Sequence, residues 1–222
     1  MALTSRKKRP LVRDSTTLRD DRLFIVACDD TYAPKQYFGF LRISRVQIHV
    51  IPTTDGSSAA SHVLDRLLEY NFDDGDVRWL ILDTDHYSSG AHLKSLKVTL
   101  RRAKQLGVHV AMSKPCFELW LLLHHVPEPE VIGLANADET VAALRENLGS
   151  FNKTSLNPEH FPTKLIPDAY VRAKRLDRTG VPGDPPIQNT SRVYRLLEQI
   201  AGTANPTQLP LDLQALVAMT EQ

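Results

Sequence analysis

Cysteine is scarce in this sequence, and its scarcity excludes two classes of small domain. The 222 residues include only Cys28 and Cys116, which stand in largely apolar surroundings and without CxxC spacing. A disulfide framework or a zinc knuckle needs more cysteines at closer spacing. We therefore expect two buried, reduced thiols in a cytoplasmic protein.

Long apolar runs and strong net charge are also missing. No segment approaches the roughly 20 apolar residues needed to span a bilayer, and the basic N-terminus lacks the apolar stretch of a signal peptide. We therefore expect no membrane partner. The net charge is only +1, so bulk charge does not indicate a polyanionic partner. The length suits one sizeable α/β domain, or a core with an appendage.

Short apolar runs and helical patterns alternate along the first half of the chain. Four rounds of strand and helix predict an α/β fold with a mostly parallel sheet flanked by helices. The strand at 45–51 alternates polar and apolar residues, which places it nearer the sheet edge. The helix that begins near residue 60 has Ser57 or Ser58 as its expected cap. The expected strands are 22–30, 45–51, 78–83 and 108–112, and the expected helices are 35–42, 60–68 and 91–106.

Beyond Val126 the pattern becomes helical. Just before this change, Ser113 is placed to cap a helix whose first turn contains Pro115. The predicted organisation is a basic flexible tail (1–20), an α/β core (21–126) and a helical extension (127–222). The tail is either solvated or in contact with a phosphate backbone. Helices are expected at 138–148, 167–178, 191–201 and 209–219, the last of which could dock on the core or pair with a second copy in a homo-oligomer.

Acidic residues follow two of the expected strands at the point where each ends. Asp83 and Asp85 are two positions apart, so their side chains project to the same side, and Asp29 follows the first strand. The carboxyl ends of parallel strands share one edge of the sheet, where ligands bind. Because converging carboxylates repel each other without a cation between them, Asp29, Asp83 and Asp85 are candidate ligands of Mg²⁺ or Mn²⁺. Turns that end each strand are the alternative, but they explain one acid at a time and not the convergence.

Glu118 would lie near the same edge, in the first turns of a helix. It can stabilise the positive end of the helix dipole there, or it can serve as a further oxygen ligand. His124 and His125 are also potential metal ligands, but they lie well along the same helix.

A basic stripe is expected on the helix at 91–106. No acidic residue occurs from His86 to Phe117, and four basic residues recur there at helical spacing. Such a stripe can hold a nucleic-acid backbone without reading its sequence. The alternative is an ordinary solvated helix face. The residues of the stripe are Lys94, Lys97, Arg101 and Lys104.

Five segments resemble segments of the RloB-like protein family, in the same order, from about Leu23 to about Leu197. The most specific is Cys-Phe-Glu-Leu-Trp at 116–120, inside a run close to the family's SNPCFELWLLLH. The other four are 28–38 (CEGExTExxYF in the family), Asp83-Thr-Asp85 (DxD), 151–153 (YDK) and 189–193 (NPSTxV).

The resemblance implies a Toprim-like domain, a Rossmann-like metal-dependent fold shared by topoisomerases, primases and OLD-type nucleases. Members are often encoded beside an ATPase and are linked to phage defence. The expected function is therefore a divalent-metal-dependent nuclease of DNA or RNA that acts with an ATPase partner. Lys153 would offset charge in the transition state, unless it is an exposed loop residue. The family's functional positions correspond here to Asp29 (its Toprim glutamate), Asp83 and Asp85 (its DxD), Glu118 and Lys153.

The sequence departs from the family pattern around the first acid. Asp29-Asp30-Thr31 replaces Glu-Gly-Glu, Pro34 replaces a later glutamate and Lys114 replaces an asparagine. Fewer acids then reach a second metal position, which argues against a two-metal mechanism. The departure motivates an alternative function, a catalytically silent module that binds an ATPase. A phosphatase with Asp83 as nucleophile ranks last, because Tyr87 stands where such sites have threonine or valine.

Overall fold

A five-stranded sheet organises the protein, whose computed structural model describes residues 22–44, 46–54, 56–87, 90–177 and 183–220. The strand order is β2-β1-β3-β4-β5, in which β1 to β4 are parallel and β5 is antiparallel to β4. The predicted mostly parallel α/β fold is confirmed, and β2 lies at the sheet edge as expected. The strands are β1 (Arg22–Cys28), β2 (Val46–Ile51), β3 (Val77–Asp83), β4 (His109–Lys114) and β5 (Thr190–Ser191).

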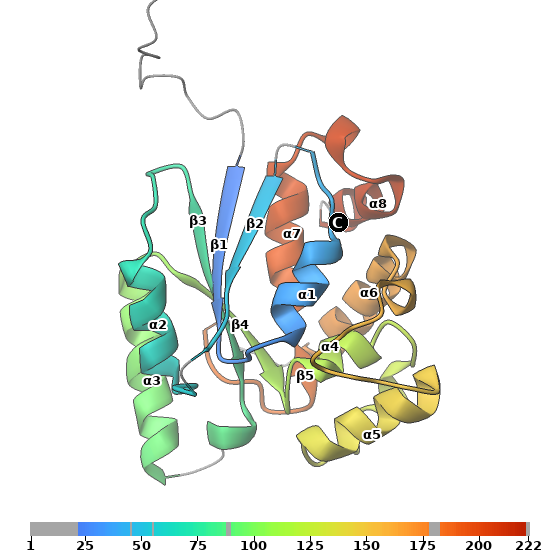
Figure 1. The fold of residues 1–222 in the computed structure, drawn as a ribbon, viewed down its shortest axis with the longest axis horizontal. Helices are drawn as coiled ribbons and strands as arrows, with labels where there is room; N and C mark the ends of the chain where they lie inside the picture. Colours follow the sequence, from blue (N-terminus) through green and yellow to red (C-terminus); the bar gives the residue numbers. More distant parts are fainter. Residues whose placement is uncertain (1–21, 45, 55, 88–89, 178–182, 221–222) are drawn as a thin grey trace, which may run out of the picture.

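Two layers of helices cover the sheet (Figure 1). One face is covered by α2 (Ala60–Glu69) and α3 (Gly90–Gln105). The opposite face is covered by α1, α4 and α7, and α6 and α8 pack against α7. The bounds of these other helices are α1 (Ala33–Phe40), α4 (Glu118–Leu122), α5 (Ala137–Leu148), α6 (Ile166–Leu176), α7 (Val193–Thr203) and α8 (Leu211–Thr220).

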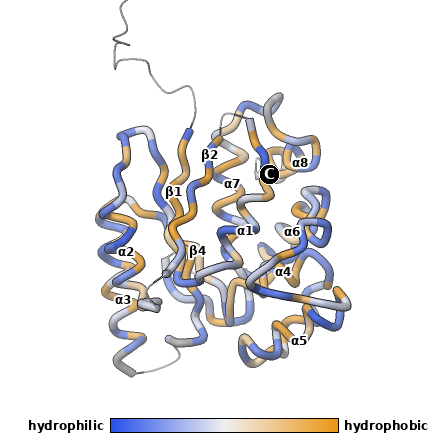
Figure 2. The backbone as a smooth tube through the Cα atoms, in the orientation of Figure 1, coloured by the Kyte–Doolittle hydropathy of each residue, from blue (hydrophilic) through white to orange (hydrophobic). Residues whose placement is uncertain are grey.

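The alternation of side chains along β1 divides the hydrophobic core into two clusters. Ile25 and Ala27 belong to the cluster on the α2 and α3 side, whereas Phe24 and Val26 belong to the cluster that includes the C-terminal helices. This is the period of two that a strand imposes. The strand is coloured hydrophobic along most of its length in Figure 2, as expected for a strand that is buried on both faces.

The C-terminal half completes the sheet. Thr190 and Ser191 of β5 pair with Lys114 and Ser113 at the end of β4, a strand that the sequence pattern did not reveal. Helices α6 to α8 share one hydrophobic cluster with β1 and β3. Among the described residues, no helix has both the length and the apolar character needed to cross a membrane. The basic tail at 1–20 lies outside the described residues.

Two predicted helix caps are wrong. Ser113 does not cap a helix, because β4 continues through it and pairs it with Asp83 on one side and Ser191 on the other. The Lys114–Pro115 peptide bond is cis, and α4 begins only at Glu118. Neither Ser57 nor Ser58 caps α2 with its side chain, because the hydroxyl of Tyr87 accepts the hydrogen bond from the Ala60 amide at 2.7 Å.

Candidate acidic site at the carboxyl edge of the sheet

Neighbouring strands bring two of the predicted acids into contact. β1 pairs with β3, and the amide of Asp29 donates to the carbonyl of Ile81 just beyond the end of β1. Asp29 in turn accepts a hydrogen bond through Oδ2 from the backbone amide of Asp83, at 2.8 Å. The convergence inferred from the two strand ends is therefore a direct contact in the structure.

The turn after β3 is fixed to the chain that follows β4. The amides of Thr84 and Asp85 both donate to the carbonyl oxygen of Pro115, at 3.1 and 3.2 Å, and Thr84 also donates to Ser113. Asp85 begins a short 3₁₀ turn, Asp85–Tyr87. Because Pro115 lies three residues before Glu118, the backbone that carries Asp85 is tied to the segment that leads into α4.

The two touching acids are half-buried and incompletely hydrogen-bonded. Within the described part of the chain, the Oδ1 atoms of Asp29 and Asp83 are buried and have no hydrogen-bond partner. Burial raises the pKa of Asp29 to about 7, although the hydrogen bond from the Asp83 amide opposes the shift. Burial also raises the pKa of Asp83, and the charges of Asp29 and Glu118 raise it further. Ionising these acids together is therefore unfavourable without a nearby cation.

Lys153 joins this edge of the sheet through two ion pairs. Its Nζ atom contacts Oδ2 of Asp30, and it lies 3.0 Å from Oε1 of Glu118, whose residue is 1% exposed. Burial alone would lower the pKa of Lys153, but the carboxylates of Glu118 and Asp30 outweigh it and raise that pKa. With 42% of its side chain exposed, Lys153 lies between the buried acids and solvent.

Asp30 is a structural residue as well as a partner of Lys153. Its Oδ1 atom accepts hydrogen bonds from the amides of Tyr32 and Ala33, at 2.6 and 2.9 Å, and so satisfies donors at the start of α1. One carboxylate thus holds both the beginning of α1 and the side chain of Lys153.

Sequence reasoning missed Gln36 on α1. Its side-chain Nε2 donates to the carbonyl of Lys153 at 3.1 Å, and its Oε1 accepts from the amide of Leu156 at 2.8 Å. We call this pair of hydrogen bonds the Gln36 clamp. It fixes the backbone of the loop from which Lys153 reaches Asp30 and Glu118. The sequence around Gln36 does not indicate a contact with a residue 117 positions away, so this clamp could not be predicted.

The remaining predicted residues lie away from the acids. Lys94, Lys97, Arg101 and Lys104 are all exposed along α3. His124 is buried between Tyr37, whose hydroxyl lies 3.2 Å from its Nε2 atom, and the carbonyl of Trp120. Burial lowers the pKa of His124 to about 3, so the ring is a neutral hydrogen-bonding member of an aromatic cluster.

The donor set can be compared with what a metal ion needs. In the described ranges, no three or more His, Cys, Asp or Glu side chains form a group positioned to hold a metal ion. Mg²⁺, however, keeps several waters and commonly binds through only one or two carboxylates. The buried, unpartnered Oδ1 atoms of Asp29 and Asp83 therefore fit a largely hydrated divalent cation.

These observations define the class of protein. The protein is a mostly parallel α/β protein whose strand ends gather buried carboxylates and a lysine at one edge of the sheet. The chain belongs to the RloB-like protein family, whose sequence model matches residues 24–200. That match includes every residue of the acidic site. No curated protein and no solved structure matches the chain.

Proposed function

We propose that the protein is a divalent-metal-dependent nuclease of the Toprim type, which acts with an ATPase partner in defence against phage. The observation that carries this proposal is the contact between Asp29 and Asp83, two half-buried acids at the ends of adjacent strands, each with a buried Oδ1 atom that has no hydrogen-bond partner among the described residues. The nuclease type, the ATPase and the defence role rest on the resemblance to the RloB-like family.

In this proposal the chain's own residues have three tasks. Asp29 and Asp83 hold the cation, Mg²⁺ or Mn²⁺, and Asp85 lies on the turn beside them. The ion, when bound, polarises the phosphate and lowers the pKa of an attacking water. Lys153 stabilises the negative charge that develops on the phosphate. Glu118 and Asp30 hold the ammonium group of Lys153 at this edge of the sheet.

Nucleic acid would be held by charge along α3. Because Lys94, Lys97, Arg101 and Lys104 are exposed on one helix, they can contact successive phosphates without reading base sequence. This supports a substrate of DNA or RNA and leaves the choice between them to experiment.

One observation favours a second candidate, a catalytically silent module that binds an ATPase. Asp30 stands where the family has glycine, and its carboxylate pairs with Lys153. A lysine that is already held by two carboxylates has less net charge to offer a phosphate than a free one. In this case the acidic edge would be a structural or regulatory site.

Cleavage by the purified protein separates the two candidates. We expect Mg²⁺- or Mn²⁺-dependent cleavage of DNA or RNA that is lost when Asp83→Asn and Asp85→Asn are combined, with Mn²⁺ affinity measured by calorimetry falling in parallel. The exposed Asp74→Asn is the matched control and should change neither. Wild-type Mn²⁺ affinity in the double variant would refute the site, and Mn²⁺ binding without cleavage of any nucleic acid would favour the silent module.

A further inference from the structure

A groove runs along the open edge of β4, between the two helical layers of the sheet. It has a volume of about 810 Å³, and its lining includes Lys97, Arg101 and Lys104 of α3, His109 and Val110 of β4, and Arg195 of α7. Figure 1 shows α3 and α7 on opposite faces of the sheet, so the groove lies where the sheet ends between them. The volume falls within the roughly 300–1,000 Å³ of sites that hold ligands.

The floor of the groove contains unpaired backbone groups. β5 pairs only with Ser113 and Lys114, and the next bond on that side runs from the Arg192 amide to the Met112 carbonyl at 2.9 Å. Because backbone groups of a strand alternate between its two neighbours, the N–H and C=O of Val110 face the same open side. Among the described residues, nothing pairs with them there. The floor therefore offers one donor and one acceptor to a ligand.

An aromatic surface adjoins these backbone groups. The exposed ring of His109 stacks on Trp79 of β3, with centroids 4.9 Å apart and 23° between the planes. Gln199 of α7 contacts both rings: its Oε1 atom accepts a hydrogen bond from Nε1 of Trp79 at 2.8 Å, and its Nε2 atom lies 3.5 Å from Nε2 of His109. Burial lowers the pKa of His109, so the ring is a flat, neutral surface at neutral pH. Such a ring can stack against a nucleobase.

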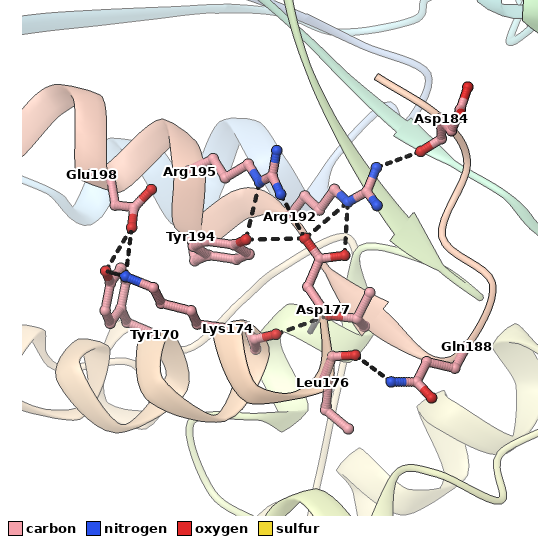
Figure 3. A network of polar contacts seen from close by, with 12 residues as sticks. Tyr170, Lys174, Leu176, Asp177, Asp184, Gln188, Arg192, Tyr194, Arg195 and Glu198 are labelled. Carbon is pink, nitrogen blue, oxygen red and sulfur yellow. Dashed lines mark hydrogen bonds and ion pairs between the residues drawn. The ribbon is translucent and has the colours of Figure 1, made fainter. Parts of the chain in front are cut away.

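One wall of the groove is basic. Lys97, Arg101 and Lys104 are exposed and form no ion pair within the described ranges, whereas Lys94, the fourth residue of the stripe, does not line the groove. On the opposite wall, Arg195 donates to Asp177 at 2.9 Å and to the hydroxyl of Tyr194 at 3.0 Å (Figure 3). Asp177 also pairs with the buried Arg192, and the exposed Asp184 lines the groove on this side, so the two arginines of this wall are balanced by two carboxylates. The free positive charge lies on the α3 side.

We propose that this groove binds single-stranded nucleic acid, with the phosphates along α3 and the bases toward β4. The inference rests on the proposed nuclease function and narrows its substrate class. A positive wall beside an aromatic surface is the arrangement by which proteins hold single strands. A duplex keeps its bases paired inside and would meet only the rim of the groove. An acidic extended peptide would match the charges and the strand edge, but it would leave the aromatic surface unused.

Binding measured without metal tests the groove separately from catalysis. The probes are fluorescein-labelled oligo(dT) and oligo(U) of about 12 nucleotides, within the usual size of single-strand sites, and a duplex of equal length. Anisotropy is followed in EDTA across a salt series. We expect the single strands to bind about tenfold tighter than the duplex. We also expect Lys97→Glu with Arg101→Glu to reduce the salt slope by about 1.4, because two phosphate contacts of about 0.7 each are lost.

Two further variants make the test specific. Arg145→Glu with Lys164→Glu reverses the same number of exposed charges elsewhere and should bind as wild type. His109→Ala should weaken single-strand binding about fivefold or more through lost stacking, with the salt slope unchanged. Equal affinity for duplex and single strand, or equal losses of binding in the two double variants, would each overturn the proposal. So would binding of labelled polyglutamate by a protein that binds no oligonucleotide. Retained single-strand binding without metal-dependent cleavage would refute the nuclease and leave the groove intact.

Discussion

The Gln36 clamp yields a sharp prediction, because one side chain fixes the loop that carries Lys153. Gln36→Leu keeps a similar size but removes both hydrogen bonds to the backbone of Lys153 and Leu156. Each such bond contributes about 0.5–1.5 kcal/mol net, so their loss should cost about 1–3 kcal/mol. In a protein of this length that cost corresponds to a fall in Tm of about 2–12 °C.

The functional effect of Gln36→Leu should be selective. The clamp does not touch Asp29 or Asp83, so Mn²⁺ affinity measured by calorimetry should remain at the wild-type value. Metal-dependent cleavage should fall by about tenfold, about 1.4 kcal/mol in the barrier, because the ammonium group of Lys153 is no longer held in one place. The exposed Gln105→Leu on α3 is the matched control and should alter neither Tm nor cleavage.

A specific result would refute this reasoning. If Gln36→Leu melts and cleaves as wild type, the ion pairs with Asp30 and Glu118 alone hold Lys153, and the clamp is incidental. A fall in Mn²⁺ affinity together with cleavage would show instead that the loop supports the acidic pair as a whole.

Three further predictions concern the acids and one cap. Because burial raises the pKa of Asp29 to about 7, folding favours its protonated form, so its contribution to metal-free stability should be full below about pH 4 and lost as the pH rises toward 7. Asp29→Asn should flatten that fall in thermal melts, and an unchanged pH profile would contradict the assignment. Asp29→Glu should lower cleavage, because the 2.8 Å contact with the Asp83 amide already fits the shorter acid, and higher cleavage would show that the natural site is weakened. Tyr87→Phe should cost about 1 kcal/mol in chemical denaturation, because the amide of Ala60 loses its acceptor, whereas unchanged stability would mean that water replaces the hydroxyl.

The parts of the site that follow strand periodicity could be predicted from the sequence. Apolar runs ending in acids predicted that Asp29 and Asp83 would lie side by side, and the pairing of β1 with β3 confirms it. The features that were missed depend on contacts between distant segments. β5 has only two residues and no sequence pattern of its own. Ser113 was wrongly expected to cap a helix, because nothing near it in the sequence indicates its partner Ser191, 78 residues away.

The distance along the chain between β4 and β5 has a consequence for biosynthesis. β1, β3 and β4, which bring Asp29 and Asp83 together, are all made before residue 115. The sheet face that contains Phe24 and Val26 shares its hydrophobic cluster with Leu196 and Leu197 of α7, which are made more than 70 residues after β4 ends. Until then that face has no cover from α7, a state in which incomplete domains are prone to aggregate. We therefore expect the nascent chain to be most prone to aggregation while residues 114 to 193 are being made.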